Sequence, residues 1–399
     1  MYRSVFILFF LVTISCSKKE FKVEDIQFPY GYNNAQPNLV SEDGNLTLSW
    51  ISSAENNEAV LSYSQYKFNS WSKPTRITSG SDWFVNWADF PAHAVNENLI
   101  LTSYLKKSDT GTYNYDIFLN LETLSGKIKK NFLLNTDGIK AEHGFVSMIP
   151  SNNKGFFITW LDGRNTVNNT NETHHKAMTI RFAEITSIGD IINEVELDAT
   201  TCDCCQTSIA KTSEGPIVVY RNRSENEIRD IYISRFRDNI WEKPIAVHND
   251  GWEINGCPVN GPKVVVNSSN IAVAWFTAAE GKPKVNISFS TSNATDFKPP
   301  IQLNDLDALG RVDVAFLNPN EVLVSYMELD AAGTYLKIKK VSIDGKVSEA
   351  KTIAIIDEGR NTGVPQLEIM KENVFLVWTN VVKGKNQLKT VKLNSKSFY

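Results

Sequence analysis

The stretch LTLSW (residues 46–50) is a short apolar run that ends in an aromatic residue, and similar runs recur along the chain. The other copies are LILTSY (99–104), GFFITW (155–160), PIVVY (216–220), IAVAW (271–275), VLVSY (322–326) and VFLVW (374–378). Their final aromatic residues are 51 to 60 residues apart. Apolar and β-branched residues bounded by turn residues are typical of buried strands. The sequence therefore contains seven repeats, each built around one such strand.

Each repeat has further strand-like runs on both sides of the repeated one. In the first repeat, PNLV (37–40) precedes LTLSW, VLSYSQY (60–66) follows it, and KPTRIT (73–78) comes fourth. Four antiparallel strands at this period form a blade of a β-propeller. We predict an all-β propeller with seven blades; the alternative is a six-bladed ring with one terminal unit packed aside. The last repeat lacks a fourth run, so we expect the strand-like residues 21–29 to close that blade.

The N-terminus predicts export. Arg3 precedes an apolar run at residues 5–14 that is too short to span a bilayer, and Cys16 follows it. We expect residues 1–16 to be a lipoprotein signal peptide with Cys16 as the lipidated residue; the alternative is a plain signal peptide. Residues 17–36 are then a tether and closing strand, and residues 37–399 form the propeller. The expected location is a bacterial cell envelope, with the protein lipid-anchored to a membrane in the periplasm or at the cell surface.

The composition excludes one class of partner. Hydrophobic residues make up 42% of the 399 residues and the net charge is only −4, so no basic field is available to attract nucleic acid. We expect a monomer that contacts the membrane only through its lipid anchor.

The unusual residues gather in one set of loops. In a four-stranded blade, the loops that lead into the first strand share a face with the loops between the second and third strands. The turns of the opposite face are short and generic. Functional sites belong on loops carried by a rigid scaffold, so we predict the site on the first face; the alternative is that its charged residues only hold the loops together. The candidates for catalysis are Asp82, Asp89, Arg164, Arg221, Arg223, Arg311 and Glu328, and those for ligand binding are Trp83, Trp87, Glu142, His143, Asp162, Arg229, Asp230, Asp250, Trp252 and Asp313.

These residue types favour an anionic ligand. Converging guanidinium groups bind a carboxylate, sulfate or phosphate through paired hydrogen bonds. Tryptophan side chains stack on sugar rings, and a pair such as Asp82 or Asp89 with Glu328 would suit glycoside chemistry. The sequence leaves two classes open: a hydrolase or lyase acting on an acidic glycan, or a non-catalytic propeller that binds a small anionic ligand or handles metal.

Three hairpins point to a family. Each keeps a serine and an aromatic residue seven positions apart, followed by Lys-Pro: Ser64 with Trp71, Ser234 with Trp241, and Ser290 with Phe297. They resemble the Asp-box (BNR) hairpin of the sialidase superfamily, with its Asp and Gly replaced. The loops CDCCQT (202–207), YRNRSENEIRDIY (220–232) and DGWEINGCPVNGP (250–262) more specifically resemble a group of bacterial sialidase-like exported propeller proteins.

The resemblance implies a glycoside hydrolase, but its site residues carry over poorly. Sialidases hold the substrate carboxylate with three arginines, and the first is absent from PYGYNNAQPNLV (29–40). The other two would come from Arg164, Arg221, Arg223 and Arg311. The tyrosine nucleophile and its glutamate would be Tyr326 with Glu328, or Tyr220 with Glu227. Both tyrosines, however, occupy the repeated aromatic position, where we favour core packing as their role. Seven repeats also depart from the six blades of sialidases.

Four cysteines remain besides Cys16. Cys202, Cys204 and Cys205 lie within TTCDCCQTS (200–208), and Cys257 lies in the loop before the fifth blade. Two disulfides are the default in an exported protein, and we favour Cys257 paired with Cys204 or Cys205, which would link two blades. The alternatives are a thiolate site for copper or zinc, assisted by Asp203 or His248, and free thiols.

Overall fold

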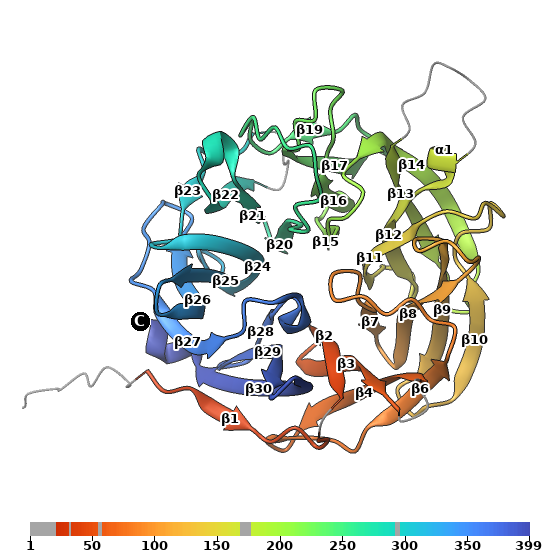
Figure 1. Ribbon diagram of the computed structural model, residues 1–399, viewed down its shortest axis with the longest axis horizontal. Coiled ribbons are helices and arrows are strands. Elements are labelled where there is room, and N and C mark those ends of the chain that lie inside the picture. The colour runs from red at the N-terminus through yellow and green to blue at the C-terminus, as the bar shows by residue number, and fades with distance from the viewer. Residues whose placement is uncertain (1–20, 32, 55–57, 168–176, 292–295) are drawn as a thin grey trace, which may run out of the picture.

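The computed structural model describes residues 21–31, 33–54, 58–167, 177–291 and 296–399. Its strands form seven antiparallel sheets that stand as blades around a central axis (Figure 1). The prediction of an all-β, seven-bladed propeller is confirmed, and the six-bladed alternative is wrong. The predicted signal peptide and Cys16 lie outside the described residues, so the lipid anchor and the envelope location stay predictions. Within the described ranges, no helix is both long and apolar enough to cross a membrane.

The first four blades follow one another along the chain. Blade one comprises β2 (Asn34–Glu42), β3 (Asn45–Ser53), β4 (Ala59–Lys67) and the two short strands β5 (Ser70–Trp71) and β6 (Thr75–Gly80). Blade two comprises β7 (His93–Asn96), β8 (Leu99–Lys107), β9 (Tyr115–Thr123) and β10 (Ile128–Leu133). Blade three comprises β11 (His143–Pro150), β12 (Phe156–Asp162), β13 (Met178–Ile185) and β14 (Ile191–Thr201), with the short helix α1 (Arg164–Val167) after β12. Blade four comprises β15 (Ser208–Lys211), β16 (Pro216–Arg221), β17 (Ile231–Arg237), β18 (Ile240–Trp241) and β19 (Ile245–Ala246).

The last three blades complete the ring. Blade five comprises β20 (Lys263–Asn267), β21 (Asn270–Thr277), β22 (Lys284–Thr291) and β23 (Ile301–Gln302), with η1 (Ala279–Gly281) after β21. Blade six comprises β24 (Asp307–Asn318), β25 (Glu321–Asp330), β26 (Gly333–Ser342) and β27 (Lys351–Ile356), followed by η2 (Arg360–Thr362). Blade seven comprises β28 (Gln366–Met370), β29 (Asn373–Val382), β30 (Lys385–Asn394) and β1 (Glu24–Ile26), and the chain ends in η3 (Ser395–Phe398).

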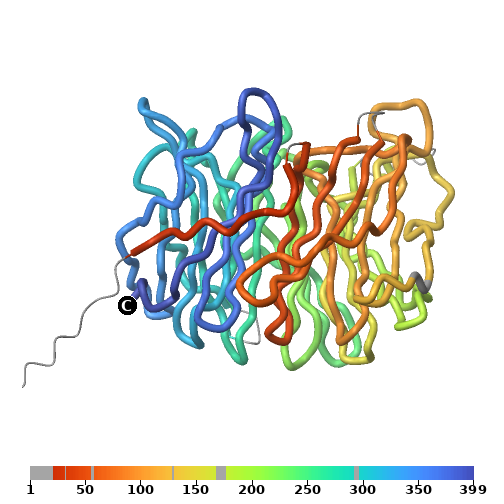
Figure 2. Tube along the Cα trace, turned by 90° about the horizontal axis from the view of Figure 1, so that it is seen from below, coloured from red at the N-terminus to blue at the C-terminus, as the bar shows by residue number. Residues whose placement is uncertain are grey.

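The N-terminal strand closes the last blade, as predicted. β1 pairs antiparallel with β30, placing Asp25 opposite Val391 and Ile26 opposite Thr390. The Thr390 hydroxyl also donates to the Ile26 carbonyl oxygen at 2.7 Å. Figure 2 shows the N-terminal segment running alongside the C-terminal blade. The two ends of the chain therefore share one sheet.

The repeated aromatic residues form the packing between blades. All seven are buried: Trp50, Tyr104, Trp160, Tyr220, Trp275, Tyr326 and Trp378. Trp50 packs with Ile26 of the closing strand and with Phe375 of blade seven, so the same hydrophobic cluster joins the first and last blades. Core packing is thus the role of the repeated aromatic position, including Tyr220 and Tyr326.

Weakening the closing strand is expected to destabilise the whole ring. Ile26 is only 8% exposed and is the buried side chain of β1, so Ile26→Ala should lower the free energy of unfolding by about 2–4 kcal/mol. Glu24→Ala, which changes an exposed side chain of the same strand, should stay within about 0.5 kcal/mol of the parent protein. Denaturant unfolding of both variants is the measurement, and equal stabilities would show that β1 is dispensable.

The innermost strand of every blade faces the axis. β2, β7, β11, β15, β20, β24 and β28 contribute residues to a central cavity of about 380 Å³. The loops that lead into six of these strands are residues 81–92, 134–142, 202–207, 247–262, 303–306 and 357–365. We call the end of the propeller that these loops form, together with the loops between second and third strands, the long-loop face.

Candidate functional site

Two carboxyl groups share one phenol at the long-loop face. The Tyr115 hydroxyl lies 3.0 Å from Asp89 Oδ2 and 2.8 Å from Glu142 Oε1. Asp89 and Tyr115 are buried, whereas Glu142 is partly exposed. Asp89 belongs to the loop before blade two, Tyr115 begins β9, and Glu142 ends the loop before blade three. We call these three residues the acid–tyrosine cluster.

Local structure fixes each member of the cluster. Tyr115 and Glu142 form a parallel bridge, and the Tyr115 ring stacks on Phe84 with centroids 4.1 Å apart. Asp89 Oδ1 accepts a hydrogen bond of 2.6 Å from the Phe145 amide. Gly144 lies directly against the Asp89 carboxylate, where a Cβ atom would collide with it. The cluster is therefore held by blades two and three together.

The environment keeps protons on this cluster. Burial raises the pKa of Asp89 to about 8. Burial, together with the negative charge of Asp203, raises the pKa of Glu142 to about 7. Burial and the two carboxyl groups raise the pKa of Tyr115 well above its usual value, so the phenol remains protonated. An acid whose pKa lies near neutral pH can both give and take a proton, which is the property required of a general acid–base group.

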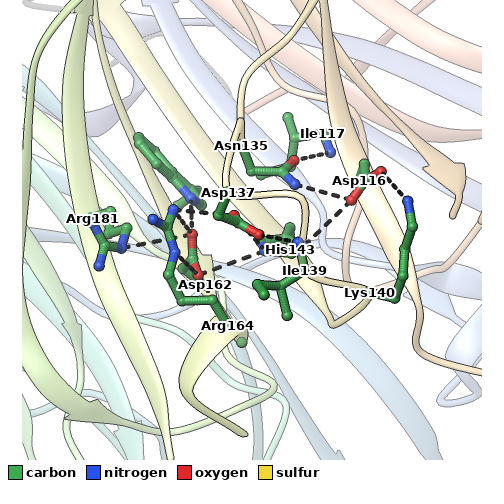
Figure 3. A network of polar contacts seen from close by, with 12 residues as sticks. Asp116, Ile117, Asn135, Asp137, Ile139, Lys140, His143, Asp162, Arg164 and Arg181 are labelled. Atoms are coloured by element: carbon green, nitrogen blue, oxygen red, sulfur yellow. Dashed lines mark hydrogen bonds and ion pairs between the residues drawn. The ribbon is translucent and has the colours of Figure 1, made fainter. Parts of the chain in front are cut away.

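His143 and Asp162 belong to a separate network of charges between blades two and three (Figure 3). His143 Nε2 lies 3.2 Å from Asp137 Oδ2 and 3.6 Å from Asp162 Oδ1, and its Nδ1 lies 3.6 Å from Asp116 Oδ1. Arg164 donates to both oxygens of Asp162, from Nε at 2.8 Å and from Nη2 at 2.7 Å. Although burial opposes it, hydrogen bonds from Arg164 hold the pKa of Asp162 below its usual range. These contacts join blades two and three, and the Arg164 guanidinium is engaged with Asp162.

Asp137, His143 and Asp162 could also hold a metal ion by distance alone, because their ligand atoms lie within 4.8 Å of one another. Arg164 Nη2 lies 3.3 Å from Asp137 and 2.7 Å from Asp162, so a positive charge already occupies this position. We therefore interpret the group as an ion network rather than a metal site.

The loop that carries Cys202, Cys204 and Cys205 contacts two of the predicted arginines. Arg229 Nη1 donates to Cys202 Sγ at 3.2 Å, and its Nη2 donates to Glu227 at 2.7 Å. Arg223 binds Glu227 at 2.7 Å and Asp203 at 3.0 Å. Because Asp203 acts electrostatically on Glu142, the charges of this region continue into the acid–tyrosine cluster.

The four cysteines are free in the structure, so the predicted disulfides are not formed in it and are not confirmed. Cys202 and Cys205 are buried, Cys204 is partly exposed and Cys257 is exposed. Hydrogen bonds from Cys204 and Cys205 hold the pKa of Cys202 well below its usual value.

Arg221 has a structural position. It is 1% exposed, and its guanidinium donates to the backbone carbonyl oxygens of Arg229, Asn260 and Phe276 at 2.6, 2.8 and 2.7 Å. Its charge also lies over the Trp252 ring at 4.9 Å. These contacts join blades four and five. The Arg221 guanidinium is therefore engaged with the backbone.

Arg311 is occupied in the same way between blades six and seven. Its guanidinium donates to the carbonyl oxygens of Glu358, Gly359 and Gly363 at 3.0–3.1 Å and lies over the Trp87 ring at 5.0 Å. Burial lowers its pKa to about 10. Arg221 and Arg311 thus both bind backbone carbonyl oxygens and serve as loop anchors.

Several predicted carboxylates cap backbone amides. Asp230 accepts from the amides of Gly251 and Trp252, and Glu328 accepts from those of Asp305 and Leu306. The remaining acidic and aromatic candidates have the following contacts: Asp250 accepts from His248 and Trp275, Asp313 accepts from Val314 and Leu367, Asp82 pairs with Lys106, and Trp83 stacks on Tyr104. Most of the candidate set therefore orders the loops.

The tyrosine–glutamate pairs expected from the resemblance are not made. The Tyr326 hydroxyl lies 3.2 Å from the Leu303 carbonyl oxygen, and the Tyr220 hydroxyl lies 2.6 Å from Asp198. The structure brings Tyr115 and Glu142 together instead. Sequence reasoning missed Tyr115 because it lies outside the repeated aromatic position; its place at the long-loop end of a third strand was the available signal.

Comparisons with known proteins identify the fold class. No protein-family model matches the sequence, and a search of curated proteins finds no match. Among solved structures, an ulvan lyase of a polysaccharide lyase family matches with a TM-score of 0.56 at 11% identity, covering 94% of this chain and 95% of that chain. A mutant of the NanB sialidase from Streptococcus pneumoniae matches with a TM-score of 0.50 at 11% identity, covering 94% of this chain and 71% of that chain. The chain thus has a sialidase-like propeller fold, as predicted.

Proposed function

We propose that this protein is a glycan-cleaving enzyme in which Glu142 transfers protons to and from the substrate. The observation that carries the proposal is the acid–tyrosine cluster, in which two protonatable carboxyl groups meet one phenol at the long-loop face. Similarity of fold to a sialidase and an ulvan lyase supports a carbohydrate substrate. Both hydrolysis and elimination of a glycosidic bond need a group that moves a proton at neutral pH.

Glu142 is the member of the cluster that a substrate can reach. It is partly exposed, whereas Asp89 is 3% exposed and the Tyr115 side chain is fully buried beneath Phe84. Tyr115 and Asp89 are then positioning residues: the phenol donates to the Glu142 carboxylate, and the protonated Asp89 side chain supports the phenol oxygen. The pKa of about 7 at Glu142 suits a group that acts as a general acid on the leaving oxygen.

We further propose that the substrate is acidic and that its anionic group meets Arg223. The Arg223 side chain is 24% exposed and belongs to the loop between the second and third strands of blade four. It already binds Asp203 and Glu227, so a substrate carboxylate or sulfate would have to displace one of them. Arg221 and Arg311 are buried and already donate to backbone carbonyl oxygens, so they do not fit this role.

The experiment is a turnover screen of the purified protein against sialylated, sulfated, uronate-containing and neutral glycans. Glu142→Gln should lower turnover by at least about 100-fold while the protein stays folded. Glu97→Gln, an exposed glutamate in the short turn between β7 and β8, is the matched control and should leave turnover unchanged. Arg223→Ala should lower turnover of acidic glycans only.

The pH profile of turnover tests whether Tyr115 positions Glu142 or has a purely structural role. If protonated Glu142 is the acid, turnover should fall above about pH 7. The Tyr115 hydrogen bond lowers the pKa of Glu142, so Tyr115→Phe should move this alkaline limb to higher pH. Saturable glycan binding without turnover would reject the enzyme and support the alternative, a non-catalytic ligand-binding propeller.

A further inference from the structure

The sulfur atoms of Cys202, Cys204 and Cys205 converge on one point. Cys202 Sγ lies 3.5 Å from Cys205 Sγ and 3.9 Å from Cys204 Sγ, and all three lie within 4.8 Å of one another. Three sulfurs that each lie about 2.3 Å from a shared ion are roughly 4 Å apart. The spacing of the three thiols is therefore that of a three-thiolate metal site.

The backbone around the cluster is fixed from several sides. The Cys202 amide donates to the Arg221 carbonyl oxygen at 3.0 Å. The Gln206 side chain donates to the Ala88 carbonyl oxygen at 2.7 Å and accepts from the Gly261 amide at 3.0 Å. The Thr207 hydroxyl donates to the Phe145 carbonyl oxygen at 2.7 Å. Loops of neighbouring blades thus hold residues 202–207 in place, and a ligand would meet a preformed donor set.

The surroundings supply positive charge to balance thiolates. Arg229 is 3% exposed and donates to Cys202 Sγ at 3.2 Å. The buried Arg221 guanidinium acts electrostatically on both Cys202 and Cys205. Buried charges need such partners, and groups that hydrogen-bond to metal ligands orient them. Two arginines beside three thiols suit a site in which several thiolates bind one cation of low charge.

The donor set distinguishes between metals. Asp203 and His248, which the sequence offered as further ligands, do not join the three sulfurs; across the described residues, this group of close ligand atoms contains no carboxylate or imidazole. Structural zinc almost always takes four ligands, and the C-x-C-C spacing is not that of a zinc knuckle. Soft thiolates in a three-member set favour Cu(I).

We propose that Cys202, Cys204 and Cys205 bind one Cu(I) ion as thiolates, with Arg229 hydrogen-bonded to the Cys202 sulfur. Cys202 and Cys205 are 1% and 2% exposed, so the ion would be resident within the fold, reached from the side of the partly exposed Cys204. The proposal is independent of glycan cleavage, because none of the three sulfurs belongs to the acid–tyrosine cluster.

The test titrates Cu(I) into the reduced full-length protein without oxygen, in competition with a chromogenic Cu(I) chelator. We expect one tightly bound Cu(I) per chain, and X-ray absorption at the copper edge should show three sulfur neighbours. Arg229→Gln should weaken binding by about 10- to 100-fold, as expected for a group that hydrogen-bonds to a metal ligand. Cys204→Ser should weaken it further, and Cys257→Ser, which changes the exposed cysteine, should bind as the parent protein does.

Thiol alkylation provides a readout that does not depend on a folded variant. In the parent protein, Cu(I) should protect Cys204 from alkylation and leave Cys257 reactive. The proposal is wrong if the reduced protein binds no Cu(I), if Cu(I) protects Cys257 as well as Cys204, or if Cys204→Ser binds Cu(I) unchanged. It is also wrong if zinc binds more tightly than Cu(I) with a nitrogen or oxygen ligand, or if a disulfide among Cys202, Cys204 and Cys205 survives the reduction.

Discussion

At pH 8, an Asp89→Asn variant is expected to be more stable than the parent protein, by up to about 5 kcal/mol. Burial raises the pKa of Asp89 from 3.8 to about 8. Ionising this carboxyl group in the folded protein is therefore costly. Asparagine has a similar shape, can accept a hydrogen bond from the Phe145 amide and can donate one to the Tyr115 oxygen. It therefore keeps the local contacts but has no carboxyl group that could ionise.

The direction of this stability difference follows from the number of protons bound by the folded and the unfolded protein. Between about pH 4 and pH 8 the unfolded chain has lost the Asp89 proton while the folded protein retains it, so the folded state binds more protons. The contribution of Asp89 to the free energy of unfolding is present below pH 4, falls by about 1.4 kcal/mol for each pH unit above it, and levels off near pH 8. The stability difference between the variant and the parent should therefore grow from near zero at pH 4.

Denaturant unfolding at pH 4, 6 and 8 measures this difference. The matched control is Asp82→Asn, which changes a carboxylate that is 53% exposed on the same loop, and its stability should follow that of the parent protein at every pH. Parallel stability curves for Asp89→Asn and the parent protein would mean that Asp89 ionises normally in the folded state.

Asp162→Ala is expected to destabilise the protein by roughly 3–5 kcal/mol, because removing one partner of a buried ion pair leaves the other uncompensated. Asp162 is fully buried and receives two hydrogen bonds from the Arg164 guanidinium and one from Trp160 Nε1 at 3.0 Å. Its loss leaves the buried Trp160 N–H without its acceptor. Among the residues that the structure describes, Arg164 would keep its contacts with Asp137 and Glu194, at 3.3 and 3.2 Å.

Thermal or denaturant unfolding of Asp162→Ala, Arg164→Ala and the double variant forms a double-mutant cycle. The effects should be less than additive, because each single change strands the partner that the double variant removes. Asp344→Ala, which breaks an exposed pair with Lys346 at 3.1 Å, is the control and should cost under about 1 kcal/mol. Additive single effects would show that Asp162 and Arg164 act independently.

The fold could be predicted because its signal is repeated. Trp50, Trp160 and Trp275 occupy equivalent positions, and each must fill the same space between blades, so one pattern appears seven times. The closing strand could be predicted because the last repeat lacked a strand and residues 21–29 supplied a candidate. Repetition also predicted that Tyr220 and Tyr326 are core residues.

The sequence predicted which face of the propeller carries the candidate site, but not how its residues contact one another. Asp89 and Glu142 were among the candidates, but their shared partner Tyr115 was not, because contacts between two loops and the start of one strand leave no periodic pattern. The loop-anchoring contacts of Arg221 and Arg311 could not be predicted for a related reason. A buried arginine that binds backbone carbonyl oxygens has the same sequence signature as one that binds a ligand, and only the fold distinguishes them.

The pairing of β1 with β30 has a consequence for the order of assembly. Ile26 and Thr390, joined by a hydrogen bond, are 364 positions apart, so β1 is synthesised before the other strands of the propeller and must wait for β30 before it can pair. A polypeptide halted anywhere before β30 cannot close its ring, however many blades have formed. The ring is thus closed by the pairing of β1 with β30, which can form only after β30 has been synthesised.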